Sequence, residues 1–209
     1  EGKVLFAGLE WSGNFRTDLE LDPLNNLRVI SGINNAAAAY SLPKNEVFTT
    51  PKFWYTLSSK GKGYASRNLH DWSRNNKILD GKGSRMTLLN NWEATYFNFD
   101  EDKLKVLIAD SKKLGVDMFL LDDGWFGNNY PRNNDNAGLG DWEVNKKKLP
   151  NGIGTLVKTA KDNQVKFGIW IEPEMVNPAS DLYKKHPEWV IKQPARAEHY
   201  FRNQLVLDQ

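Results

Sequence analysis

The first part of the chain alternates between apolar and polar residues in short runs. Within Phe15–Leu21 every second residue belongs to one side, which is the period of a strand with one covered face. Further strands are predicted over Val4–Trp11, Leu27–Ile33, Glu46–Thr50 and Phe53–Ser58, with Gly, Asn and Pro marking the turns between them. Together with a connecting helix near residues 64–77, this pattern predicts the C-terminal part of an antiparallel β-sandwich over residues 1–85.

From Met86 onward, apolar runs alternate with stretches of helical period. The predicted strands cover residues 86–90, 116–121, 165–171 and 205–208, and the predicted helices cover 101–114, 152–163 and 179–185. Asp100 is a suitable N-cap for the first of these helices, and Gly115 is suited to end it. Strands that are apolar on both faces are typical of parallel sheets covered on both sides.

The pattern of residues 86–209 therefore predicts the first half of a (β/α)8 TIM barrel, with four core strands. The fold class is thus multidomain, β followed by α/β. A doubly wound open sheet is the alternative, but no glycine-rich dinucleotide loop follows the first strand. A complete barrel takes about 250 residues, and this chain has 209 in total, opening without a methionine. We therefore expect an excerpt from a longer protein.

Composition narrows the function classes. The 28 Lys and Arg residues nearly balance the 26 Asp and Glu residues, so we expect no nucleic-acid partner, and no apolar run suggests a membrane span. The chain has no cysteine, which excludes disulfides, thiolate zinc sites and a cysteine nucleophile, and fits a cytoplasmic location. Its three histidines lack metal-ligand spacing, so we expect no metal and no cofactor.

Unusual polar residues follow the predicted barrel strands. Asn90–Glu93 follows the first strand, Asp122–Phe126 the second and Trp170–Met175 the third, while Arg202–Gln204 precedes the fourth and Asp208 ends it. The C-terminal ends of barrel strands form the active-site rim. Carboxylates accept hydrogen bonds from hydroxyl groups, and indole faces cover the apolar C–H patches of sugar rings. The pattern therefore indicates a sugar pocket.

Structural roles are the alternative for each of these residues. Asp122 and Asp123 could cap the next helix, Trp170 could pack in the core, and Arg202 could be an ordinary ion-pair partner of one of the acids. Lys146–Lys148 has the pattern of a solvated face.

A set of motifs in fixed order resembles glycoside hydrolase family 36. From Asn90 onward the motifs are LLDDGWFG at 120–127, LGDW at 139–142, KLPNG at 148–152, FGIWIEPEMV at 167–176, HPEW at 186–189 and RNQLVLD at 202–208. Upstream, SGNF at 12–15, GIN at 32–34 and FTTP at 48–51 resemble the end of the family's N-terminal β-supersandwich domain. The resemblance implies that 1–85 is the end of that domain with a linker, and that 86–209 is the first half of the catalytic barrel.

The family consists chiefly of α-galactosidases, so the resemblance implies a retaining exo-α-galactosidase acting on melibiose- and raffinose-type α-galactosides. By motif position, Asp122 and Asp123 would bind hydroxyls of the galactose in the −1 subsite. Trp170 and Arg202 would line the same subsite, and Trp92 would shape its entrance.

The resemblance also implies where the bond-breaking groups lie. The family's nucleophile and acid/base are aspartates expected beyond Gln209, so the chain itself holds no catalytic residue by this comparison. Family members are often tetramers, which implies a homo-oligomer. An α-N-acetylgalactosaminidase or a galactosyl transferase of the raffinose-synthase kind are the alternative activities, and a non-catalytic carbohydrate-binding protein is the alternative class.

Overall fold

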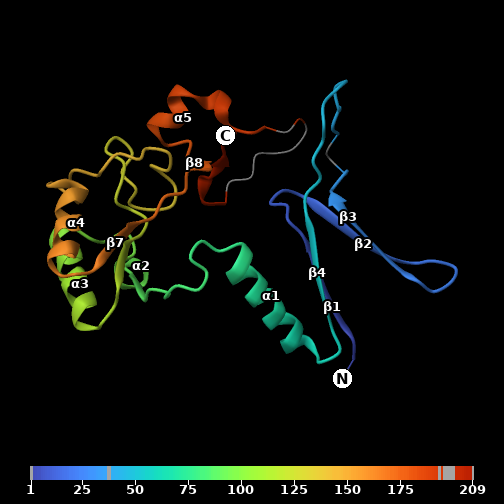
Figure 1. The fold of residues 1–209 in the computed structure, drawn as a ribbon. Helices are drawn as coiled ribbons and strands as arrows, with labels where there is room; N and C mark the ends of the chain where they lie inside the picture. Colours follow the sequence, from blue (N-terminus) through green and yellow to red (C-terminus); the bar gives the residue numbers. More distant parts are fainter. Residues whose placement is uncertain (1, 37–38, 193, 195–200, 209) are drawn as a thin grey trace. The chain divides into compact units, whose positions relative to one another are not determined.

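The computed structural model describes residues 2–36, 39–192, 194 and 201–208. Contacts divide the chain into two units, Glu1–Ser84 and Arg85–Gln209, and each is described by itself (Figure 1). None of the described helices is long and apolar enough to cross a membrane.

The first unit contains two antiparallel strand pairs and one helix. Its elements are β1 (Val4–Leu9), β2 (Phe15–Leu21), β3 (Leu27–Ile33), β4 (Phe53–Ser58) and α1 (Lys62–Asn76). β1 pairs with β4, and β2 pairs with β3 from Phe15 opposite Ile33 to Leu21 opposite Leu27. The Asp22 carboxylate orders the turn between β2 and β3, since its Oδ1 accepts hydrogen bonds of 2.8 Å from the Leu24 and Asn26 amides.

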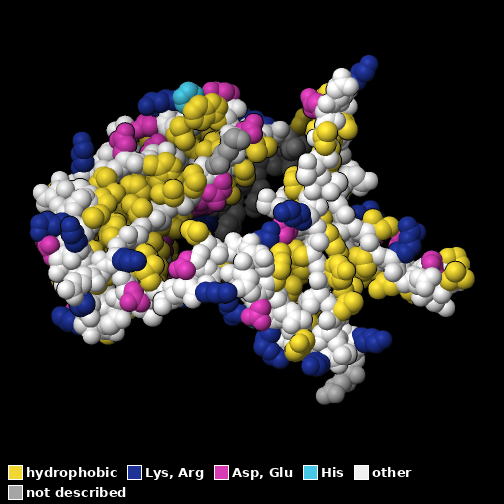
Figure 2. All heavy atoms as spheres, in the orientation of Figure 1, with side chains coloured by type: hydrophobic (Ala, Val, Ile, Leu, Met, Phe, Trp, Pro, Cys, Tyr) yellow, Lys and Arg dark blue, Asp and Glu magenta, His cyan; other side chains and the backbone are white. Residues whose placement is uncertain are grey.

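The prediction for this unit is confirmed for the strand pairing but not for a packed sandwich. Both buried apolar clusters of the described residues lie in the second unit. Figure 2 shows hydrophobic side chains on the surface of the first unit, where Leu19 and Leu21 are 70% and 69% exposed. The strand predicted over Glu46–Thr50 is wrong, because these residues are exposed and pair with no strand among the described residues.

The second unit is built on a parallel sheet with strand order β5-β6-β7. Figure 1 labels β7 of this sheet and the helices α3 and α4. Its elements in chain order are β5 (Leu88–Asn90), α2 (Trp92–Thr95), α3 (Glu101–Lys113), β6 (Met118–Leu121), α4 (Gly152–Asp162) and β7 (Lys166–Ile169). The main core joins Leu104 and Ile108 of α3, Leu156 of α4, and Phe119 and Leu121 of β6. These elements confirm the predicted alternation of strands and helices for the first three predicted strands.

The fourth predicted barrel strand is wrong. The remaining elements are β8 (Met175–Val176), α5 (Asp181–Lys185), two short 3-10 helices (Pro187–Trp189 and Phe201–Asn203) and β9 (Leu205–Val206). β9 pairs antiparallel with β8 in a sheet of its own. Leu205 is buried against Val176 and Val190 in a small second cluster, whereas Val206 is exposed. β9 therefore lies outside the parallel sheet of β5, β6 and β7.

We expect Asp100→Ala to lower the free energy of unfolding by about 1 kcal/mol, the usual effect of losing an N-cap. Asp100 Oδ1 accepts a hydrogen bond of 2.9 Å from the Lys103 amide in the first turn of α3. Asp102→Ala is the matched control, because the Asp102 side chain is 97% exposed and the substitution removes the same charge from the same turn. Urea denaturation compares the two variants, and equal losses would contradict the capping role.

Candidate functional site

The two adjacent acids stand at the C-terminal end of β6, where the loop begins. Asp122 is tied to the end of β5: its Oδ2 accepts a hydrogen bond from Asn90 Nδ2, and its amide donates to Asn91 Oδ1 at 2.8 Å. Asp122 Oδ1 also accepts from the Asp123 amide at 2.7 Å. The carboxylate of Asp122 is therefore held at the sheet edge and remains half-buried.

Asp123 is buried and forms a bidentate ion pair with a buried arginine. Arg132 Nε lies 2.9 Å from Asp123 Oδ1, and Nη2 lies 2.8 Å from Oδ2. The exposed fractions are 0% for Arg132 and 4% for Asp123. Asp123 therefore does not cap the next helix, which begins only at Gly152. The sequence analysis did not single out Arg132, although it is the only cation in the Asn- and Gly-rich stretch 124–141.

The loop after β6 wraps around Arg132. Nη1 of Arg132 donates to the carbonyl oxygens of Asp135 at 2.9 Å and Ala137 at 3.3 Å. Gly127 has a φ of +82° and Gly138 a φ of +84°, and a Cβ at either would lie within 2.5 Å of the Tyr130 carbonyl oxygen. Glycine is therefore required at both positions for this close backbone approach.

Arg202 reaches the same loop from the segment before β9. Its φ of +60° places it in the left-handed region, and its Nη2 donates to Asp135 Oδ1. The fully buried Asn177 joins the two segments: its Nδ2 donates to the carbonyl oxygens of Asp135 at 3.2 Å, Arg202 at 3.3 Å and Asn203 at 2.8 Å. Arg202 thus pairs with an acid, as the structural alternative held, but with Asp135 rather than with an acid at a strand end.

The two tryptophans differ in their packing. Trp92 begins α2, is half-buried, and contacts the Phe97 ring edge-on at 4.9 Å between centroids. Trp170 follows β7, stacks on Phe126 at 6.4 Å, and packs against the main core. Its carbonyl oxygen accepts a hydrogen bond of 3.0 Å from Trp125 Nε1. Trp170 therefore contributes to the core, and it is only partly buried.

The parallel register brings several of the predicted site residues to one edge. Asn90 pairs with Leu120, and the Trp170 amide donates to the Leu121 carbonyl oxygen at 2.8 Å. Asp122 directly follows Leu121, so it lies between the ends of β5 and β7. The Trp92 amide donates to Asn90 Oδ1 at 2.7 Å, which adds the start of α2 to this edge. Arg202 is connected to this region through its ion pair with Asp135, a residue of the loop after β6.

Glu172 adds a further carboxyl group to this charged region. Burial, and next the negative charge of Glu174, raise the pKa of Glu172, whereas Arg202 and Arg132 act in the opposite direction. Its two carboxylate oxygens accept from Gln204 Nε2 at 3.2 and 3.3 Å. Within the described ranges, no group of three or more His, Asp or Glu side chains could hold a metal ion. The region therefore offers carboxylate acceptors and guanidinium donors that suit a polyhydroxylated ligand.

Lys148 does not belong to a solvated face, contrary to the sequence prediction for Lys146–Lys148. Its Nζ donates to the carbonyl oxygens of Phe97, Gly124 and Arg132 at 3.0, 2.8 and 3.3 Å. The ammonium group thus connects two carbonyl oxygens of the loop after β6 to that of Phe97. Burial lowers the pKa of Lys148 to about 8.

The lowered pKa of Lys148 predicts a pH effect on stability. Between about pH 8 and its usual 10.5, the unfolded chain binds more protons at this residue than the folded chain does. The free energy of unfolding should therefore rise with pH across this window relative to a Lys148→Met variant. Urea denaturation of both proteins from pH 7 to about pH 10 measures the difference, and a constant or falling difference would contradict the assignment.

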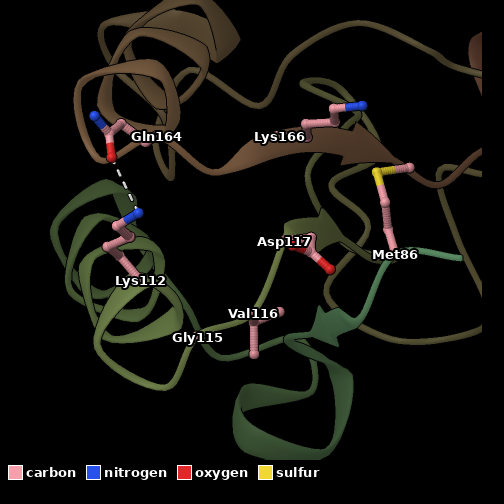
Figure 3. A pocket seen from close by; sticks show the side chains of 7 residues that line it. All are labelled: Met86, Lys112, Gly115, Val116, Asp117, Gln164 and Lys166. Atoms are coloured by element: carbon pink, nitrogen blue, oxygen red, sulfur yellow. Dashed lines mark hydrogen bonds between the residues drawn. The ribbon is translucent and has the colours of Figure 1, made fainter. Parts of the chain in front are cut away.

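A cavity of about 340 Å³ lies at the opposite end of the strands (Figure 3). Figure 3 shows Asp117 and Lys166, which stand at the amino ends of β6 and β7, and the 3.0 Å hydrogen bond from Lys112 Nζ to Gln164 Oε1. Active sites of barrels lie at the carboxyl ends of the strands. We therefore place the candidate site at the Asp122 edge.

Two families match successive parts of the chain. Residues 47–209 match the Melibiase family, and residues 1–43 match the glycosyl hydrolase family 36 N-terminal domain. The chain is 42% identical to the α-galactosidase Mel36A of Lactobacillus acidophilus and 41% identical to the α-galactosidase AgaA of Geobacillus stearothermophilus. These matches cover 99% and 100% of the chain but only 28% of each relative.

Solved structures are also similar. A variant of AgaA from Geobacillus stearothermophilus in complex with raffinose superposes with a TM-score of 0.91 at 41% identity, covering 99% of this chain and 29% of that one. Another AgaA variant was solved in complex with stachyose, with the same TM-score and identity. Since the Melibiase match covers well over half of the sequence, the chain belongs to the melibiase family of glycoside hydrolase family 36.

Proposed function

We propose that this chain is the sugar-binding segment of a retaining exo-α-galactosidase that hydrolyses terminal α-D-galactosyl residues of raffinose-type oligosaccharides. The observation that carries the proposal is the carboxylate pair at the end of β6, Asp122 and Asp123, set beside indole side chains at the carboxyl edge of a parallel sheet. The relatives named α-galactosidases, one of them solved with raffinose, support the substrate class.

In this proposal each predicted residue has a binding role. Asp122 and Asp123 accept hydrogen bonds from hydroxyls of the galactose, Trp170 and Arg202 line the same subsite, and Trp92 shapes its entrance. Asn90 holds the Asp122 carboxylate, Asn91 holds the Asp122 amide, and Arg132 holds the Asp123 carboxylate. Both carboxylates are thus preorganised, so little conformational freedom is lost when the sugar binds.

The proposed reaction is a double displacement. One carboxylate attacks the anomeric carbon while a second, about 5–5.5 Å away, protonates the leaving oxygen, and water then hydrolyses the covalent intermediate. We propose that residues 86–209 belong to the first half of the catalytic barrel, with β5, β6 and β7 as three of its strands. The two reacting carboxylates would come from the rest of the complete enzyme. The residues of this chain orient the sugar and strengthen its hydrogen bonds in the transition state.

The complete enzyme tests the proposal with nitrophenyl α-galactoside, β-galactoside and α-N-acetylgalactosaminide. We expect turnover of the α-galactoside alone, release of α-galactose as the first anomer seen by NMR, and free galactose from raffinose. Turnover of the acetamido sugar, or galactosyl transfer without free galactose, would assign one of the alternative activities. The 209-residue chain alone should hydrolyse none of the three.

A further inference from the structure

Asp135 lies between two guanidinium groups of the candidate site, and the inference drawn from it rests on the proposed function. Asp135 Oδ1 accepts from Arg202 Nη2 and lies 3.6 Å from Arg132 Nη2. Arg132 Nη2 in turn lies 2.8 Å from Asp123 Oδ2. Asp123, Arg132, Asp135 and Arg202 thus form one chain of alternating charges between two of the proposed sugar-binding residues.

Burial decreases along this chain. The side chains of Arg132 and Asp123 are 0% and 5% exposed, whereas those of Asp135 and Arg202 are 36% and 38% exposed. The fixed end therefore lies in the interior, and the Arg202 end is accessible to a ligand. In the described part of the chain, Arg202 Nε is buried without a hydrogen-bond partner, so the orientation of this guanidinium depends on Asp135.

The backbone of both residues is held by other groups. The Asp135 carbonyl oxygen accepts from Arg132 Nη1 at 2.9 Å and from Asn177 Nδ2 at 3.2 Å. The Arg202 carbonyl oxygen accepts from Asn177 Nδ2 at 3.3 Å. Changing the Asp135 side chain therefore removes its contact with the Arg202 guanidinium and the longer one with Arg132, and it leaves these main-chain contacts in place.

We propose that Asp135 is a positioning residue, which orients the Arg202 guanidinium relative to the Asp123 carboxylate so that both meet the same sugar ring. Asp135 acts through Arg202 and does not itself touch the substrate. An arginine side chain has several rotatable bonds, and a charged hydrogen bond to one oxygen restricts them before the sugar arrives.

The test measures kcat/KM of the complete enzyme for nitrophenyl α-galactoside in a double-mutant cycle. Asp135→Asn should lower kcat/KM about tenfold, and Asp135→Glu, which keeps the charge, should recover part of that loss. In an Arg202→Ala background, Asp135→Asn should change kcat/KM by less than about twofold. A residue with a merely structural role would have the same effect in both backgrounds.

Asn136→Ala is the matched control, because Asn136 Oδ1 accepts from Asn203 Nδ2 at 3.0 Å and joins the same two segments without touching Arg202. We expect less than a twofold change for it. If the wild type is active, any one of three results would overturn this inference alone. These are an unaffected Asp135→Asn variant, equal losses in both backgrounds, and an equally impaired Asn136→Ala variant. An inactive wild type would overturn the proposed function, and this inference with it.

Discussion

Replacing Asp123 with alanine in the complete enzyme is expected to lower kcat/KM for an aryl α-galactoside at least roughly 100-fold. Under the proposed function, the Asp123 carboxylate accepts hydrogen bonds from hydroxyls of the reacting sugar. It is held in one orientation by two contacts with Arg132, at 2.9 and 2.8 Å, so the sugar meets a preorganised group. Steady-state kinetics with nitrophenyl α-galactoside measures the loss, and wild-type kinetics would rule out the assignment.

Destabilisation is a second route to lost activity, since Asp123→Ala leaves the buried Arg132 guanidinium without its carboxylate. The double variant Asp123→Ala with Arg132→Met separates the two effects. Removing both charges should recover part of the free energy of unfolding, because no unpaired ion remains in the interior. If the carboxylate binds the sugar, activity stays low in the double variant. Activity that returns together with stability would indicate a structural role only.

Arg132→Met is expected to lower the free energy of unfolding by about 3–5 kcal/mol, the effect of breaking a buried ion pair from one side. The variant leaves the buried Asp123 carboxylate without its ion-pair partner. It also removes the donor to Asn177 Oδ1, at 3.0 Å, and to the Asp135 carbonyl oxygen. Urea denaturation of the complete protein, followed by tryptophan fluorescence, measures the loss.

Lys158→Met is the control for Arg132→Met within the same unit. Lys158 pairs with Asp162 on the surface of α4, where the two side chains are 74% and 56% exposed. Exposed pairs of this kind contribute about 0.3–0.5 kcal/mol. A loss below about 1 kcal/mol for Arg132→Met, or a loss no larger than that of the control, would contradict the contribution to the free energy of unfolding that we assign to the buried pair.

Local periodicity predicted most of the regular structure. The strands predicted over Phe15–Leu21, Leu27–Ile33 and Phe53–Ser58 are present with the same bounds. The two-residue period of Phe15–Leu21 predicted the strand correctly, although its apolar side chains are exposed in this unit. The helix predicted at 101–114 ends one residue earlier, at Lys113, with Asp100 as its N-cap. The pattern failed at residues 205–208, where a short apolar run records burial but not the partner, and the partner is β8 rather than β7.

The sequence alone was sufficient to place Asp122 and Asp123 at the carboxyl end of a buried strand, because strand ends follow from the apolar run before them. It was not sufficient to predict that Arg132 pairs with Asp123, that Asp135 pairs with Arg202, or that Lys148 supports the loop. Residues 124–151 lie outside the helices and named strands and have no period. Which acceptor each cation reaches depends on the path of that loop, and long-range packing against Asn177 and the core sets that path.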